Sequence, residues 1–358
     1  MSDAVAWDLA QRVAVRVAGR EPAPPEEADS LEPDFEELTS LAEELVAEET
    51  GLKSLSGPAR ARVTDRAGWV QVNMAGFRRL LGPLTAKLEP RLGRGSPIMT
   101  QAARAVAGVQ VGTILGWMST RVLGQYDLLL TEEGRDEDQD IVYYVGPNVL
   151  GLEDRFGFPP REFRLWLALH EVTHRAQFTG VPWLKGHFLS LVERAVAAVD
   201  PDPRRLLDGL RRAAEDIWAG RNPLAEGGLL GVVAGPEERA VLDQVQAFMS
   251  LLEGHGDVTM DRAGKGRIPN AEQFSRVLRE RRRQASAAAR LFQQLIGLEA
   301  KLRQYEQGER FIAEVEKAGG PELFSQVWRG PEWLPSMAEV RDPARWIERV
   351  RSQTNGTG

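Results

Sequence analysis

Cysteine is absent from this chain of 358 residues, and only four histidines occur in it. A cysteine-rich structural zinc site is therefore excluded, so any zinc site must draw its protein ligands from His, Asp and Glu. The lack of cysteine also fits a reducing compartment, and we expect the protein to be cytoplasmic. Hydrophobic residues make up 42% of the chain and charged residues 27%, as in an ordinary soluble globular protein.

Long apolar runs are missing as well. The best candidate, Gln101–Leu123, has an uncharged stretch that begins at Ala105, is short for a membrane span and includes Gln110. We therefore expect no membrane span and predict a buried helix instead. Its close packing against a neighbouring helix is indicated by three glycines at four-residue steps, Gly108, Gly112 and Gly116.

Acidic residues outnumber basic residues, 52 to 45. The net charge of −7 provides no basic surface, so we expect no nucleic-acid partner. Asp3 and Asp8 stand where a secretory signal would be positively charged, so the N-terminus does not resemble one.

No basic residue lies between Arg20 and Lys53, and Asp34–Thr50 reads as a helix whose polar face is almost wholly Glu. We expect that face to be solvated, with a basic partner as the weaker alternative. Pairing with the arginine-rich segment Ala59–Leu92 stays open.

The most informative motif is H-E-x-x-H, formed by His170, Glu171 and His174. It lies in Leu165–Phe178, which has helical spacing of apolar residues, prolines before it and a glycine after it. His170 and His174 would lie one helical turn apart and could share one metal ion. Glu171 would lie beside that ion, where a general base can hold a water molecule.

A third ligand is expected from a second helix. Glu253 ends an apolar helical run, and Asp257 follows one turn later on the same face. Glu253 could bind the metal, while Asp257 could accept the free N–H of His170 and fix its tautomer. His255 is an alternative ligand or a polar group near the substrate.

These residues resemble the gluzincin branch of the zinc metallopeptidases, in which two His and a Glu bind zinc and an Asp supports one His. More narrowly, HEVTHRAQF, EGHGDVTMD and GLEAKLRQYEQGERF are similar to a bacterial family of zincin-like metallopeptidases. That family is found mainly in actinobacteria and carries a label of association with deazaflavin coenzyme biosynthesis. The resemblance runs from Trp7 to Trp346 and implies a zincin-like fold with a Zn²⁺ site, but no particular substrate.

Two segments read as strands, Gln125–Leu130 and Ile141–Val145. They predict a hairpin just before the metal helix. Ile141–Gly146 would either bind an extended substrate by strand addition or only complete a small sheet, and the two alternatives stay open.

We therefore expect a mainly helical α+β protein with a zincin-like metallopeptidase fold and a small β-sheet next to the H-E-x-x-H helix. An N-terminal helical region, 1–124, would pack on a catalytic region, 125–350, as one compact unit with a flexible tail, 351–358.

The expected function is zinc-dependent hydrolysis of a peptide or small amide, with Glu171 as the general base that takes a proton from a zinc-activated water. One of Lys301, Arg303 and Tyr305, in the third motif, could stabilise the oxyanion. His187 could face the substrate or the surface. The alternative is a non-catalytic scaffold that a metal ion stabilises.

Overall fold

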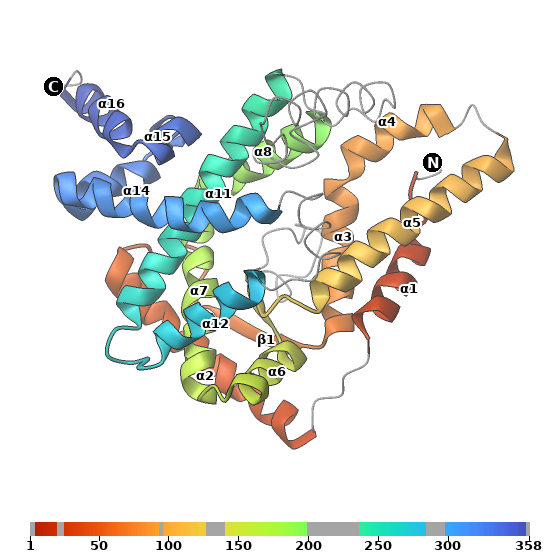
Figure 1. Ribbon diagram of the computed structural model, residues 1–358, viewed down its shortest axis with the longest axis horizontal. Helices are drawn as coiled ribbons and strands as arrows, with labels where there is room; N and C mark the ends of the chain where they lie inside the picture. Colours follow the sequence, from red (N-terminus) through yellow and green to blue (C-terminus); the bar gives the residue numbers. More distant parts are fainter. Residues whose placement is uncertain are drawn as a thin grey trace. The chain divides into compact units, whose positions relative to one another are not determined.

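The structure is a computed structural model that describes residues 4–19, 25–92, 96–126, 140–198, 236–283 and 298–355. It is mainly helical with one small sheet, so the predicted α+β class is confirmed (Figure 1). Within the described ranges, no helix has the length and apolar character that a membrane span needs. The helices are α1 Trp7–Ala18, α2 Pro25–Thr50, α3 Arg66–Leu80, α4 Gly82–Leu92, α5 Pro97–Ser119, α6 Gly146–Phe156, α7 Pro160–Gly180, α8 Leu184–Ala198, α11 Pro236–Ala263, α12 Ala271–Arg283, α14 Leu298–Phe324, α15 Met337–Arg341 and α16 Pro343–Asn355.

The chain forms two compact units, each made of two segments. The first unit comprises Met1–Gly180 and Thr259–Arg276, and the second comprises Val181–Val258 and Val277–Gly358. Helices α11 and α12 each contribute residues to both units. The division into regions 1–124 and 125–350 stays a prediction. Helix α16 ends at Asn355, within the range 351–358 that was expected to be a flexible tail.

The sheet belongs to the first unit and has the strand order β1-β3-β2. Strand β2 (Gly124–Tyr126) pairs antiparallel with β3 (Ile141–Val145), which confirms the predicted hairpin pairing. Residues 127–139 lie outside the described ranges. Strand β1 (Arg60–Thr64) pairs parallel with the other side of β3 and was not predicted. Its sequence, RARVT, carries too many charges to be recognised as a strand without its partner.

The position of β3 decides between the two alternatives for Ile141–Gly146, which are substrate binding by strand addition and completion of a small sheet. Both edges of β3 are already paired, with β1 on one side and β2 on the other. All five residues of the strand are buried. An uncharged run such as IVYYV is typical of a central strand covered on both faces, so Ile141–Val145 completes the sheet and offers no free edge.

Helices α1 and α5 pack closely in the first unit (Figure 1). A Cβ atom on Gly108 would lie 2.6 Å from the carbonyl oxygen of Ala6, so only glycine allows this approach. The next two glycines of the series, Gly112 and Gly116, lie in the same way against Ala10 and Ala14. The predicted packing of the Gln101–Leu123 helix against a neighbour is confirmed.

Helix α7 is held against α2 by arginines. Arg164 is buried and donates hydrogen bonds to Glu153 on α6 and to Asp34 on α2. Burial by itself lowers the pKa of Arg164, but the hydrogen bonds with Glu153 and Asp34 outweigh it, and the pKa is raised. Near the start of α7, the exposed Arg161 pairs with Glu37 of α2.

Arg175, one residue after His174, is the most deeply buried of these arginines, with 1% of its side chain exposed. It donates to Glu43 of α2, to both carboxylate oxygens of Asp140 and to the carbonyl oxygen of Gly57. Burial lowers its pKa, and the hydrogen bonds with Asp140 and Glu43 more than offset that effect, so the pKa is raised.

The acidic residues of α2 therefore have internal partners. The expectation of a wholly solvated acidic face is wrong for Asp34 and Glu43, which pair with arginines of α7. Their partners, Arg164 and Arg175, lie outside the arginine-rich segment Ala59–Leu92. Side-chain pairing over more than 100 residues leaves no local pattern in the sequence.

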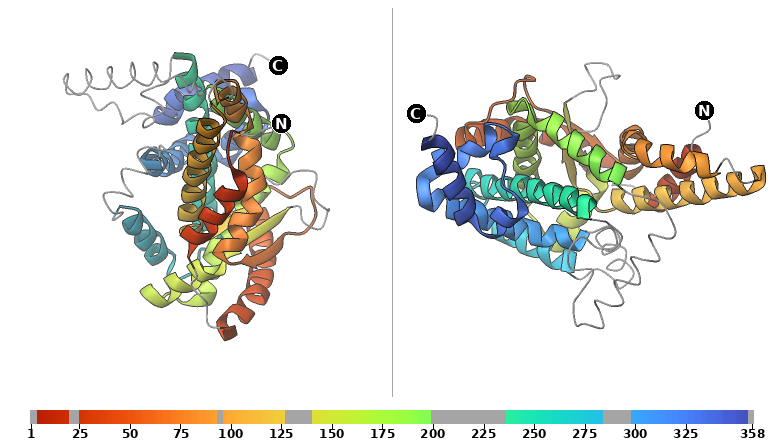
Figure 2. Two further views of the ribbon diagram at one scale, coloured as in Figure 1. Left: turned by 90° about the vertical axis from the view of Figure 1, so that its right-hand side faces the viewer. Right: turned by 90° about the horizontal axis from the view of Figure 1, so that it is seen from above.

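Figure 2 shows α14, α15 and α16 gathered near the C-terminus in the second unit. Together with α11 they share one apolar core around the fully buried Trp346. Gly254 of α11 and Gly308 of α14 meet where these helices cross, because a Cβ on Gly254 would lie 2.5 Å from the carbonyl carbon of Gly308. The glycine beside Glu253 thus makes room for α14.

Replacing Arg175 with methionine should destabilise the protein by roughly 3–5 kcal/mol, because it leaves Asp140 and Glu43 without their buried cation. The matched control is Arg161→Met on the same helix, whose ion pair with Glu37 is exposed and should matter little. Urea unfolding followed by circular dichroism measures both. Equal losses of stability in the two variants would contradict the role of Arg175.

Candidate metal centre

Helix α7 presents two histidines one turn apart. His170 and His174 are half-buried, and their Nε2 atoms lie 3.2 Å from each other. Their rings are nearly perpendicular, with an angle of 88° between the planes. The helix itself spans Pro160–Gly180, so the prolines and the glycine predicted as its limits are confirmed.

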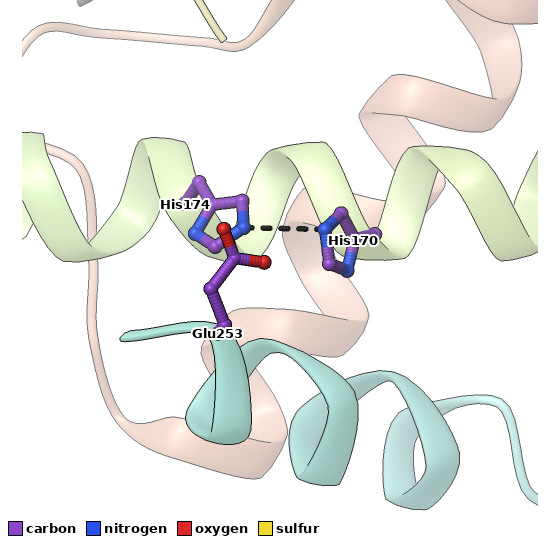
Figure 3. Close-up of side chains that lie close together, drawn as sticks. All are labelled: His170, His174 and Glu253. Atoms are coloured by element: carbon purple, nitrogen blue, oxygen red, sulfur yellow. Dashed lines mark hydrogen bonds between the residues drawn. The ribbon is translucent and has the colours of Figure 1, made fainter. Parts of the chain in front are cut away.

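Glu253 on α11 completes a group of possible ligands. One ligand atom from each of His170, His174 and Glu253 lies within 4.8 Å of the others. Figure 3 shows the carboxylate pointing toward the two imidazole rings. Two imidazoles and one carboxylate are the donor set of catalytic zinc sites that keep a position open for water or substrate. The group could therefore hold a metal ion, and it is the only such group within the described part of the chain.

Gln177 supports one of the histidines and was not predicted from the sequence. Its Oε1 atom lies 3.0 Å from Nδ1 of His174, and its side chain is fully buried. Because an amide oxygen only accepts, this hydrogen bond places the proton of His174 on Nδ1 and leaves the lone pair on Nε2. The spacing of three residues on one helix is the signal that could have identified it.

Glu171 lies outside the group of possible ligands. Its side chain is buried, and its Oε2 atom accepts a hydrogen bond of 3.1 Å from the backbone N–H of Tyr126 on β2. The charge of Glu171 also acts on the pKa of the fully buried phenol of Tyr144. Burial raises the pKa of Tyr144 above its usual value, the hydrogen bond with Thr39 opposes that rise, and the negative charge of Glu171 adds to it. Tyr144 is therefore a neutral hydroxyl.

Two other predicted residues lie on α11 with Glu253. Asp257 is partly buried one turn after Glu253, and its support of His170 stays a proposal. His255 is buried in the second unit, stacked on Phe324 with 5.6 Å between ring centroids and edge-on to Trp328. His255 is not in the group of possible ligands, and aromatic packing accounts for its position.

The remaining candidates lie on α8 and α14. His187 is partly buried between Trp183 and Phe248, and burial followed by the charge of Arg194 lowers its pKa. Arg303 and Tyr305 lie on α14, but their side chains are outside the described part of the structure. Their proposed contact with an oxyanion, like that of His187 with substrate, stays a prediction.

Gln177→Leu should lower zinc affinity by roughly 10–100-fold, because the leucine cannot accept the Nδ1 proton of His174. Gln177→Glu keeps an acceptor oxygen at that place and should retain most of the affinity. Competition with a zinc chelator measures both variants, and circular dichroism checks that they fold. If the leucine variant binds zinc as tightly as the wild type, Gln177 does not support His174.

Comparisons with known proteins identify the family of the chain. A family model described as zincin-like metallopeptidase matches residues 5–347. The chain is also similar to a candidate hydrolase with a novel fold from Chloroflexus aurantiacus, known from its crystal structure, at 31% identity and a TM-score of 0.71. The alignment covers 97% of this chain and 99% of that chain. No curated protein matches. Because the family model spans nearly the whole sequence, the chain belongs to the zincin-like metallopeptidase family, which implies zinc as the metal.

Proposed function

We propose that the protein is a zinc-dependent metallopeptidase that hydrolyses an amide bond in a peptide or small amide. The observation that carries the proposal is the arrangement around α7. His170, His174 and Glu253 could hold the metal, while the neighbouring carboxylate of Glu171 is bound to strand β2 and stays out of the ligand group. A carboxylate beside a metal site, and not on it, is available for proton transfer.

When bound, zinc would supply a Lewis acid that lowers the pKa of a water molecule and polarises the substrate carbonyl. Glu171 takes the proton from the attacking water and passes it to the leaving amine. Gln177 holds His174 in the tautomer that leaves Nε2 free for the metal. Asp257 would do the same for His170.

Two finer proposals rest on the sequence. The quoted motifs support the narrower resemblance to the actinobacterial family associated with deazaflavin coenzyme biosynthesis. Measuring the amount of that coenzyme in cells that lack the protein tests the association.

The absence of cysteine supports a cytoplasmic location. Cell fractionation tests the location, and recovery of the protein outside the cytoplasm would contradict it.

Replacing Glu171 with glutamine should lower the rate of hydrolysis by roughly 10²–10⁴-fold and leave zinc content unchanged, because glutamine cannot accept the proton. The assay is a library of internally quenched peptides incubated with the zinc-loaded protein. Glu162→Gln is the matched control: it lies on the same helix, where it accepts hydrogen bonds from Asn270.

Undiminished hydrolysis by the Glu171→Gln variant would contradict the role of the base. A wild-type protein that holds zinc and cleaves neither peptides nor small amides would instead favour the alternative, a non-catalytic scaffold that the metal ion stabilises.

A further inference from the structure

Strand β2 contacts the carboxylate of Glu171 on α7 through two of its residues, Gly124 and Tyr126. A Cβ atom on Gly124 would lie 2.7 Å from Cγ, 2.8 Å from Oε1 and 2.9 Å from Cδ of Glu171. No side chain fits at position 124 while Glu171 keeps its place. Gly124 does not have a positive φ angle, so backbone conformation does not require a glycine here. Glycine weakens a strand, and the space that Glu171 occupies explains its presence.

The same edge also provides a hydrogen bond. In an antiparallel pair, the backbone groups of successive residues point alternately toward the partner strand and away from it. The carbonyl oxygen of Leu123 accepts from Val145 N–H at 2.9 Å, so Gly124 and Tyr126 face away from β3. Tyr126 N–H donates to Oε2 of Glu171 at 3.1 Å. Two residues of one short strand thus contact the same carboxylate.

The residue between them anchors the strand to α3. Gln125 Oε1 accepts a hydrogen bond of 2.8 Å from Nε1 of Trp69, and its Nε2 donates to Oδ1 of Asn73 at 2.8 Å. Asn73 Nδ2 in turn donates to the carbonyl oxygen of Trp69 at 2.9 Å, which closes a ring. Trp69 and Asn73 are both buried. A strand of three residues has few ladder hydrogen bonds, so this ring adds the restraint that the ladder lacks.

We propose that β2 is a positioning strand for the general base. Gly124 leaves the space and Tyr126 N–H sets the orientation of the Glu171 carboxylate, while Gln125 holds the strand through Trp69 and Asn73. The proposal rests on the proposed function, because positioning matters only if Glu171 transfers a proton. The hydrogen bond to Oε2 and the close approach of Gly124 together restrict the rotation of the carboxylate. These residues act through Glu171 and are positioning residues.

A double-mutant cycle tests the contact without any need for activity. Gly124→Ala should lower the melting temperature of the zinc-supplied protein by several degrees, because the methyl group displaces Glu171. In a Glu171→Ala background, Cγ, Cδ and Oε1 are gone, so Gly124→Ala should have no such cost. Gly151→Ala on α6, where a Cβ meets no atom within 4 Å, is the control and should shift both backgrounds equally. Equal losses from Gly124→Ala in both backgrounds would overturn the inference.

Kinetics tests the function of the contact. Gly124→Ala should lower kcat by roughly 100-fold, the cost expected for a displacement of about 1 Å, with KM and zinc content unchanged. Trp69→Phe keeps an aromatic ring but loses the Nε1–H that holds Gln125. It should lower kcat, but by less than Gly124→Ala does. If Gly124 had only a structural role, Gly124→Ala would lower stability but would not lower kcat while KM stays unchanged.

The two proposals fail in different ways. Full activity of Glu171→Gln would remove the proposed base itself. If Glu171→Gln is inactive while Gly124→Ala keeps the wild-type kcat, the base is correct and the positioning strand is wrong.

Discussion

The structure depends most on the buried guanidinium of Arg175. A buried charge is tolerated only when it is paired and hydrogen-bonded. Its partners come from three distant places: Glu43 on α2, Asp140 just before β3 and the carbonyl of Gly57 before β1. Asp140 has a left-handed backbone, with φ of 57°, which aspartate tolerates better than most residues. These bonds fix how far α7 is turned about its own axis and, with it, the direction of the preceding His174.

A single helix then directs neighbouring side chains toward different tasks. Successive residues on an α-helix are about 100° apart. His170 and His174 share one direction toward the possible metal position. Glu171 is turned toward β2, and Arg175 is turned toward α2. Gln177 lies three residues after His174 and reaches back to it. In this chain the H-E-x-x-H pattern lies in a helix that is buried on nearly every side.

The sequence predicted what local spacing determines. The H-E-x-x-H helix and its limits, the glycine-faced α5 and the pairing of β2 with β3 follow from periods of 3.6 and 2 residues. Strand β1 was missed because RARVT becomes a strand only by pairing with β3, some 80 residues later. The choice between strand addition and completion of the sheet at Ile141–Gly146 stayed open because a local pattern does not show which strand is central, and the strand order decides it for completion of the sheet. The arginines of α7 pair with residues far away in the chain, and Gly124 likewise approaches a distant residue, Glu171. A single sequence has no local pattern that predicts such contacts.

The central claim is that His170, His174 and Glu253 hold zinc, and elemental analysis of the purified, zinc-supplied protein tests it most directly. The comparison sets the wild type beside a His170→Ala, His174→Ala double variant, with His187→Ala as a control for histidine outside the group. We predict about one zinc per chain in the wild type and the control, and loss of zinc in the double variant. A wild type without zinc, or a double variant that keeps it, would contradict the account.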